Sequence, residues 1–279
     1  MREPGCESAH MRILIAGSSG FLGRPLQGVL RARGHQVVPL VRRPARAGEE
    51  TWDPTSGHLD PRVLDGIDVV INLAGSPTLG NPHSSRWAES LRETRVWTTS
   101  ILAEAIAASQ APPALLAGNG ISWYGDHGGT KLDESAGSVG DAFLTRVTQE
   151  WQAGTTPAAE AGARVVVLRT APGIDRDNAP LKQMLTLFRA GLGGRLGSGR
   201  QYFPIISARD WRDAVAHLVE SQVSGPVNLC APEVPTNAEF TQALAKAVDR
   251  PAFAHVPAIA ITVAAGRMAP EVLGSVRAV

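Results

Sequence analysis

The sequence has few of the residues from which disulfides, metal sites and proton-transfer groups are built. It contains 279 residues but only two cysteines, too few for a disulfide framework or a cysteine-based metal site. Its seven histidines show no spacing typical of metal ligands, so no metal is expected. Tyrosine occurs only at Tyr124 and Tyr202, and lysine only at Lys131, Lys182 and Lys246. Chemistry that needs tyrosine and lysine together therefore has few positions available.

Long apolar runs and an excess of charge are also absent. The first ten residues are polar and lack the apolar core of a secretion signal. The longest apolar stretch, residues 256–265, is too short to span a bilayer. A formal net charge of +1 gives no general basis for binding nucleic acid or an anionic membrane. We expect a cytoplasmic protein with a disordered tail at residues 1–10 and a small-molecule substrate; the oligomeric state is not indicated.

Residues 11–23 carry the clearest pattern in the chain. An apolar run at 13–15 predicts a buried strand, and helical spacing of apolar residues begins after Gly23. Between them, Gly17 allows a tight turn, Gly20 lets a pyrophosphate approach the backbone, and Gly23 lets the helix pack closely. The free N–H groups of the helix would then face the phosphates. A glycine-rich turn without a ligand is the alternative, but the strand and helix around it favour a dinucleotide site.

The end of the second predicted strand, Gln36–Val41, indicates which dinucleotide is bound. An NAD site usually has an acidic residue here, which bonds the ribose hydroxyls. This chain has Arg42 and Arg43 after Val41, and no carboxylate. Guanidinium groups suit the additional 2′-phosphate of NADP. The residues therefore favour NADP(H), with NAD(H) as the alternative.

Strand and helix signals alternate along the rest of the chain. Such alternation predicts an α/β fold, a Rossmann-type doubly wound parallel sheet with a smaller substrate-side region. We predict a dinucleotide-binding domain at residues 11–172 and a substrate-side region at 173–279. The expected strands are 68–72, 114–117, 165–168 and 227–229, and the expected helices are 95–109, 143–161, 181–190, 210–220 and 238–248.

Five motifs carry a resemblance to a known family. They are Ala16-Gly17-Ser18-Ser19-Gly20-Phe21-Leu22-Gly23, Asn72-Leu73-Ala74-Gly75, Trp123-Tyr124-Gly125-Asp126, Leu168-Arg169-Thr170 and Gly197-Ser198-Gly199-Arg200-Gln201. In their order and spacing the chain resembles the atypical extended short-chain dehydrogenases/reductases, in the branch of epimerase-family oxidoreductases (NAD-dependent epimerase/dehydratase-like). The glycine motif is common to the whole superfamily, whereas the third and fifth motifs are more specific to this branch.

The resemblance implies a Rossmann fold with bound NADP(H). It places Leu73 and Ala74 beside the adenine and ribose, Arg95 against the cofactor, and the stretch after Thr170 near the nicotinamide. It also implies a small C-terminal domain from about residue 256, cut short here, with an apolar face near Val263 and Leu273 partly uncovered. Together, the expected cofactor-binding residues are Gly17, Ser18, Ser19, Gly20, Phe21, Leu22, Gly23, Val41, Arg42, Arg43, Leu73, Ala74, Gly75, Arg95, Pro172 and Gly173.

The usual catalytic pair of this superfamily, a tyrosine followed four residues later by a lysine, is missing. The resemblance places Phe143 and Val147 at those two positions, and neither side chain can exchange a proton. It also puts Asn119 at the position of the usual serine. We therefore name Asn119 and Tyr124 as the candidate catalytic residues, which would polarise a carbonyl.

Three functions remain open. The first is an NADP(H)-dependent oxidoreductase or epimerase-like enzyme acting on a small or sugar-like carbonyl or alcohol. The second is a cofactor-binding sensor or regulatory protein without turnover. The third is an enzyme in which the dinucleotide has a structural role.

Overall fold

The computed structural model describes residues 10–175 and 179–279, and its centre is a seven-stranded parallel sheet with the order β11-β7-β5-β4-β1-β2-β3. Its strands are β1 (Arg12–Ala16), β2 (Gln36–Val41), β3 (Glu50–Thr51), β4 (Val69–Asn72), β5 (Ala114–Gly120), β7 (Val165–Thr170) and β11 (Gly225–Leu229). β1 pairs with both β2 and β4, so the strand order reverses there. The predicted Rossmann-type α/β class is confirmed, and all carboxyl ends lie at one edge of the sheet.

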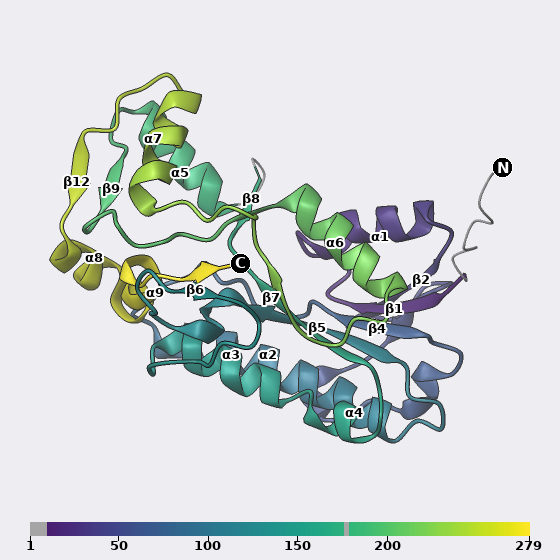
Figure 1. The fold of residues 1–279 in the computed structure, drawn as a ribbon. Coiled ribbons are helices and arrows are strands. Elements are labelled where there is room, and N and C mark those ends of the chain that lie inside the picture. Colours follow the sequence, from purple (N-terminus) through teal and green to yellow (C-terminus); the bar gives the residue numbers. More distant parts are fainter. Residues whose placement is uncertain (1–9, 176–178) are drawn as a thin grey trace.

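Helices cover both faces of the sheet (Figure 1). One face carries α1 (Gly23–Ala32) and α6 (Ala208–Glu220); the other carries α2 (Ser85–Ala107), α3 (Phe143–Ala153) and α4 (Thr156–Glu160). Along β1, Ile13 and Ile15 pack into the cluster that contains Leu26 of α1, while Leu14 packs into the cluster that contains Leu102 of α2. Burial on both faces explains why this strand is an unbroken apolar run.

Two helix predictions needed correction. The helix predicted at 95–109 begins earlier, because Ser84 caps it by accepting a hydrogen bond from the Trp87 N–H at 3.2 Å. The helix predicted at 143–161 is two helices, α3 and α4. The first ends at Gly154, and Pro157 lies in the first turn of the second. β2 spans the predicted residues, and β5, β7 and β11 contain theirs.

A group of smaller elements lies beyond the carboxyl edge of the sheet (Figure 1). It comprises β8 (Gly173–Ile174) paired with β10 (Ile206–Ser207), β9 (Gly194–Leu196) paired with β12 (Ala254–Val256), β6 (Lys131–Leu132) paired with β13 (Arg277–Ala278), and the helices α5 (Ala179–Arg189), α7 (Asn237–Ala247), α8 (Ala258–Ala265) and α9 (Ala269–Leu273). β11 and α6 come from beyond residue 172, yet they complete the main sheet and its helix layer. The sheet therefore continues past the predicted domain boundary.

The C-terminal region exposes part of its apolar surface. Val263 is 71% exposed and Ile259 is 77% exposed, whereas Leu273 is half-buried. The apolar surface expected to be uncovered here is thus exposed at Val263, and at Leu273 it is partly covered. Within the described ranges, no helix combines the length and apolarity needed to cross a membrane. The tail predicted at residues 1–10 lies, apart from His10, outside the described residues.

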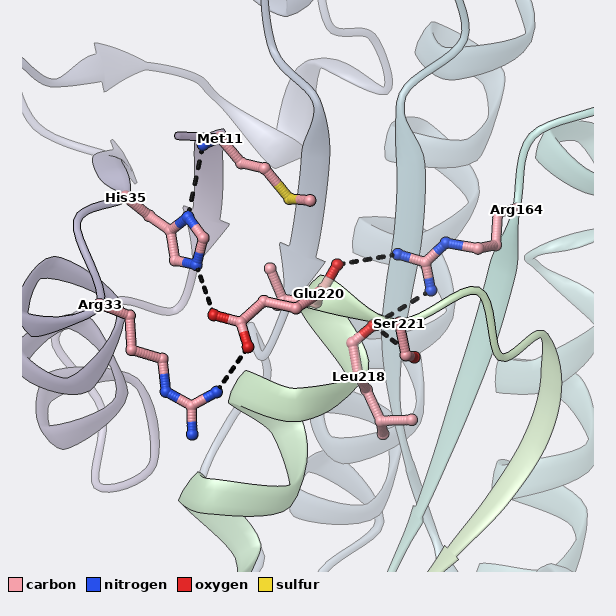
Figure 2. Close-up of polar contacts among 8 residues, drawn as sticks. Met11, Arg33, His35, Arg164, Leu218, Glu220 and Ser221 are labelled. Atoms are coloured by element: carbon pink, nitrogen blue, oxygen red, sulfur yellow. Dashed lines mark hydrogen bonds and ion pairs between the residues drawn. The ribbon is translucent and has the colours of Figure 1, made fainter. Parts of the chain in front are cut away.

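Polar contacts fasten α6 to the opposite, amino edge of the sheet (Figure 2). The Met11 N–H donates to His35 Nδ1 at 3.3 Å, so Nε2 carries the proton and donates to Glu220 at 3.0 Å. Arg33 donates to the other carboxylate oxygen of Glu220 at 2.8 Å. Arg164 donates to main-chain oxygens in the last turn of α6. This cluster is structural, because it joins strand starts to a helix end far from the glycine turn.

Candidate functional site

The predicted cofactor-binding residues come together at the carboxyl edge of the sheet. The glycine turn follows β1. Val41 is the last residue of β2, and Arg42 and Arg43 come directly after it. Leu73 to Gly75 follow β4, and Pro172 and Gly173 follow β7. The turns after β1 and β4 are in contact, since the Leu73 N–H donates to Ala16 O at 2.9 Å. Ligands of doubly wound sheets bind where the strand order reverses, which here is between β1 and β4.

The glycine turn has the geometry that its sequence predicted. Gly17 has a φ of +79°, and a Cβ placed on it would lie 2.5 Å from the carbonyl carbon of Leu73. A Cβ on Gly23 would overlap the carbonyl oxygen of Gly17. A Cβ on Gly20 would meet only that oxygen, at 3.2 Å, so the space over Gly20 is otherwise open. The tight turn at Gly17 and the close packing at Gly23 are confirmed, and the approach of a phosphate to Gly20 stays a prediction.

The backbone that leads into α1 leaves N–H groups available. Arg24 and Leu26 donate to Gly20 O and Leu22 O and Pro25 has no N–H, whereas the N–H groups of residues 21–23 have no partner among the described residues. No side chain caps this helix end within the described chain, and its first turn contains no acidic residue. Ser18 is buried, and its carbonyl accepts from Gln27 Nε2 at 2.8 Å, which holds the turn in place. Ser19 and Phe21 are exposed beside it. The arrangement suits an anion, because the helix end carries a partial positive charge.

The turn after β4 is held by the buried side chain of Asn72. Its Oδ1 accepts from the Ala74 N–H at 3.0 Å, and its Nδ2 donates to Thr99 Oγ1 at 2.8 Å. Gly75 follows, and a Cβ there would lie 3.2 Å from Arg95 Cγ. The polar residue that ends this strand therefore shapes the surface on which the resemblance places the adenosine.

Arg95 is a cation without an acidic partner among the described residues. It donates to Leu91 O at 3.0 Å and to Thr78 Oγ1 at 3.1 Å, and its guanidinium lies 5.4 Å from the ring of Trp151. Burial lowers the pKa of Arg95 to about 10. A half-buried positive charge next to Gly75 is suited to a nearby anionic ligand.

The two arginines after β2 differ in what they contact. Arg43 forms two hydrogen bonds of 2.7 Å with Glu49, and these bonds lower the pKa of Glu49 to about 2. Arg42 is exposed and forms no hydrogen bond or ion pair with any described residue. Of the pair, Arg42 is therefore the guanidinium that is available to a ligand.

Tyr124 is buried and already bonded within the fold. It has no exposed surface, and burial raises the pKa of its hydroxyl. The hydroxyl lies 2.8 Å from Asn228 Oδ1 and accepts from Arg169 Nη1 at 3.0 Å. Arg169 is itself 2% exposed and lies 3.5 Å over the ring of Trp123. Tyr124 thus helps to satisfy a buried cation, and its catalytic role stays a prediction that this geometry does not favour.

Asn119 is likewise used within the fold. Its Nδ2 donates to Thr148 O at 3.1 Å, and its Oδ1 accepts from the Gly120 N–H at 2.7 Å. The side chain is 5% exposed. These bonds tie the end of β5 to α3, so polarising a carbonyl would require the amide to leave them. A catalytic role for Asn119 stays a prediction that this geometry does not favour.

Comparisons with known proteins agree with this geometry. The family model described as "NAD dependent epimerase/dehydratase family" matches residues 13–230. The chain belongs to this family. An epimerase family protein of Mycobacterium bovis, Mb2239, is 39% identical over 265 residues, covering 94% of this chain and 87% of the relative. Human epimerase family protein SDR39U1 is 35% identical over 263 residues, covering 92% of this chain and 87% of the relative.

Solved structures of epimerase-family proteins have the same fold. The crystal structure of human SDR39U1 (isoform 2) with NADPH matches with a TM-score of 0.84 and 32% identity, covering 96% of this chain and 91% of that one. The nucleoside-diphosphate sugar epimerase of Corynebacterium glutamicum matches with a TM-score of 0.78 and 33% identity, but this chain covers only 53% of it. The resemblance inferred from the motifs is thereby confirmed at the level of the family.

At the two positions that the resemblance assigns to tyrosine and lysine, this family member has apolar residues. Phe143 begins α3, and its ring centroid lies 5.9 Å from that of Trp87. Val147 is 2% exposed in the core below it. The guanidinium of Arg267 lies 5.7 Å from the Phe143 ring. The start of α3 is therefore filled by aromatic and apolar packing.

A hollow of about 360 Å³ lies beside these residues. It is lined by Ser76, Pro77, Leu79, Ser84, Arg86, Trp87 and Ser90. Ser76 Oγ and Trp87 Nε1 are buried atoms without a hydrogen-bond partner in the described structure. Buried polar atoms are normally bonded, so two of the residues that line this hollow each carry a polar atom whose hydrogen bond is unmade in the described structure.

Sequence reasoning missed a contact made by the C-terminal segment. Glu271 of α9 accepts a hydrogen bond from Ser122 Oγ at 2.6 Å and another from the Leu144 N–H at the start of α3. Burial raises the pKa of Glu271. Glu271 and Ser122 are far apart in the sequence, and nothing in either local pattern indicates their contact.

Two further features lie apart from this edge. A larger hollow, of about 570 Å³, lies against α4, β7 and β11 and contains none of the predicted cofactor residues. Among the described residues, no three His, Cys, Asp or Glu side chains form a group that could hold a metal ion.

Proposed function

We propose that this epimerase-family chain is an NADP(H)-dependent oxidoreductase or epimerase-like enzyme that acts on a small carbonyl or alcohol. When bound, NADP(H) supplies or accepts a hydride at its nicotinamide. The glycine turn and the start of α1 would hold the pyrophosphate. The carboxyl ends of β5 and β7 would face the nicotinamide half, because β2 and β4 lie on opposite sides of β1.

The observation that carries the choice of cofactor is the unpaired Arg42. It stands at the end of β2, where an NAD site would have a carboxylate, and it has no partner among the described residues. An arginine can bond a 2′-phosphate through two parallel N–H donors. Human SDR39U1, whose fold this chain shares, was crystallised with NADPH, which supports the same choice.

The hollow beside Ser76 and Trp87 is the proposed substrate site. Its volume of about 360 Å³ suits a small ligand. Trp87 Nε1 can only donate a hydrogen bond, whereas Ser76 Oγ can donate or accept one. A substrate that carries oxygen atoms would satisfy both once the two side chains turn toward the hollow, in keeping with a carbonyl or alcohol.

A sensor without turnover is the second candidate, and the start of α3 favours it. Phe143 and Val147 supply no proton where the family resemblance expects tyrosine and lysine. A protein that binds NADPH tightly and reduces nothing would fit those substitutions.

The test has two stages. Calorimetric titration with NADPH and NADH is expected to show binding of both, tighter for NADPH. Loss of NADPH absorbance is then followed over a panel of aldehydes, ketones and keto-sugars, with oxidation of at least one compound expected. Binding of NADPH without any oxidation favours the sensor, and failure to bind either dinucleotide refutes both candidates.

A further inference from the structure

The paired side chains of Ser122 and Glu271 provide proton-transfer chemistry that the start of α3 lacks. We propose that Glu271, bonded to Ser122 beyond the carboxyl end of β5, supplies the proton of the reaction through the Ser122 hydroxyl. This inference rests on the proposed function. It assigns a proton source to a site in which tyrosine and lysine are replaced.

The position of the pair follows from the topology. If Arg42 at the end of β2 binds the adenosine phosphate and the turn after β1 binds the pyrophosphate, the nicotinamide lies on the β4–β5 side. Ser122 belongs to the 3₁₀ turn Ile121–Tyr124, which directly follows β5. Both Ser122 and Glu271 are partly exposed, so a substrate oxygen can reach them, unlike the hydroxyl of Tyr124.

Contacts through the start of α3 connect the pair to Trp87, one of the residues that line the hollow proposed for the substrate. Trp87 lines that hollow and packs against Phe143, the first residue of α3. The next residue, Leu144, donates its N–H to Glu271. A continuous series of contacts thus joins the wall of the hollow to the carboxyl group.

The surroundings of Glu271 suit a carboxyl group that holds a proton. Its hydrogen-bond partners, Ser122 and the Leu144 N–H, are uncharged; they lower its pKa, but burial is the larger effect and the pKa is raised overall. Of the nearby charged residues, Arg267 is bonded through Nε to Pro82 O, and Asp126 accepts from the Ser275 N–H. Burial raises the pKa of Glu271, so its protonated form persists to a higher pH than that of an exposed glutamate.

The proton transfer balances with carbonyl reduction. A hydride from NADPH reaches the carbonyl carbon, and both electrons of the C–O π bond move to the oxygen. For this step the Ser122 hydroxyl turns its proton from Glu271 to the substrate oxygen. That oxygen takes the proton, and Oγ takes the proton of the Glu271 carboxyl group. The products are the alcohol, NADP⁺ and a Glu271 carboxylate, which regains its proton from water. In the oxidative direction the same groups accept the proton.

The test compares Glu271→Gln and Ser122→Ala with Asp126→Asn in the full chain. Gln has nearly the size of Glu and can still accept from Ser122 and from the Leu144 N–H. Asp126 is the matched control, because it also bonds the C-terminal segment, through the Ser275 N–H at 3.2 Å. The measurements are NADPH affinity, the pH profile of kcat/KM with a compound that the wild type reduces, and carboxyl titration of the apoprotein by carbon-13 NMR.

We expect kcat to fall at least about 100-fold in Glu271→Gln and Ser122→Ala, with NADPH affinity unchanged and Asp126→Asn fully active. The wild-type kcat/KM should decline as pH rises through the pKa of Glu271. The NMR titration should give a pKa above 4.5 for one carboxyl resonance, and this resonance should be missing from the spectrum of Glu271→Gln. A Glu271→Gln variant with wild-type kcat/KM and pH profile overturns this assignment alone. A wild type that binds NADPH and reduces no compound refutes the proposed function, and the assignment with it.

Discussion

The sharpest prediction concerns Gly20, because the structure separates its expected effect on binding from any effect on folding. A Cβ at Gly20 would meet only the carbonyl oxygen of Gly17, at 3.2 Å. Gly20 does not have a positive φ, so its backbone conformation also suits alanine. We therefore expect Gly20→Ala to change the free energy of unfolding by no more than about 1 kcal/mol.

Dinucleotide binding should respond very differently. The new methyl group would stand between the pyrophosphate and the N–H groups at the start of α1. Losing one hydrogen bond to a charged group costs about 1.5–3 kcal/mol, which weakens binding about 10- to 150-fold. Both NADPH and NADH should lose affinity equally, because they share the pyrophosphate. Calorimetric titration measures the affinities, and urea unfolding measures the stability.

Two other glycines calibrate the result. Gly17→Ala should lower the unfolding free energy by more than about 2 kcal/mol, since the left-handed backbone alone costs about 1–2 kcal/mol and the methyl group also overlaps Leu73. Gly28 lies exposed on α1 with nothing within 4 Å of a Cβ, so Gly28→Ala should stabilise by about 0.5–1 kcal/mol and leave binding unchanged. A Gly20→Ala protein that binds NADPH as tightly as the wild type would refute the proposed position of the pyrophosphate.

Three further predictions follow from individual side chains. Arg42→Ala should weaken NADPH binding about 10- to 100-fold with NADH binding unchanged, and Arg43→Ala should have a much smaller effect, as measured by calorimetry. Tyr124→Phe should destabilise the protein by about 1–3 kcal/mol, because buried partners lose their bonds, while NADPH affinity and turnover stay unchanged; a large loss of turnover would instead support its catalytic role. Burial raises the pKa of Glu271, so the folded protein keeps a proton that the unfolded chain releases; stability should fall as pH rises above 4.5 and through the raised pKa, and Glu271→Gln should remove that slope in urea unfolding.

Much of the geometry of the candidate cofactor site was predictable because its determinants are local. The glycines act through their own φ and through neighbours within a few residues, and β1 is apolar throughout because both its faces are covered. Arg42 and Arg43 could be located because they directly follow a strand whose bounds were predicted correctly. The sequence alone could not show that Glu49 binds Arg43 and leaves Arg42 available.

The substrate half depended on contacts between distant segments. The position of Tyr124 at a strand end suggested a reactive group, but Arg169 and Asn228 surround its hydroxyl only after β7 and β11 have joined the sheet. The Ser122–Glu271 contact forms only when α9 packs on the start of α3.

The sequence by itself determined the class of sheet, the glycine turn after β1 and the positive charge at the end of β2, because each arises from neighbours along the chain. Only the tertiary structure decided which polar groups are buried and already bonded, and which remain free at the edge of the sheet. That outcome depends on packing between segments far apart in the sequence, and no local pattern encodes it.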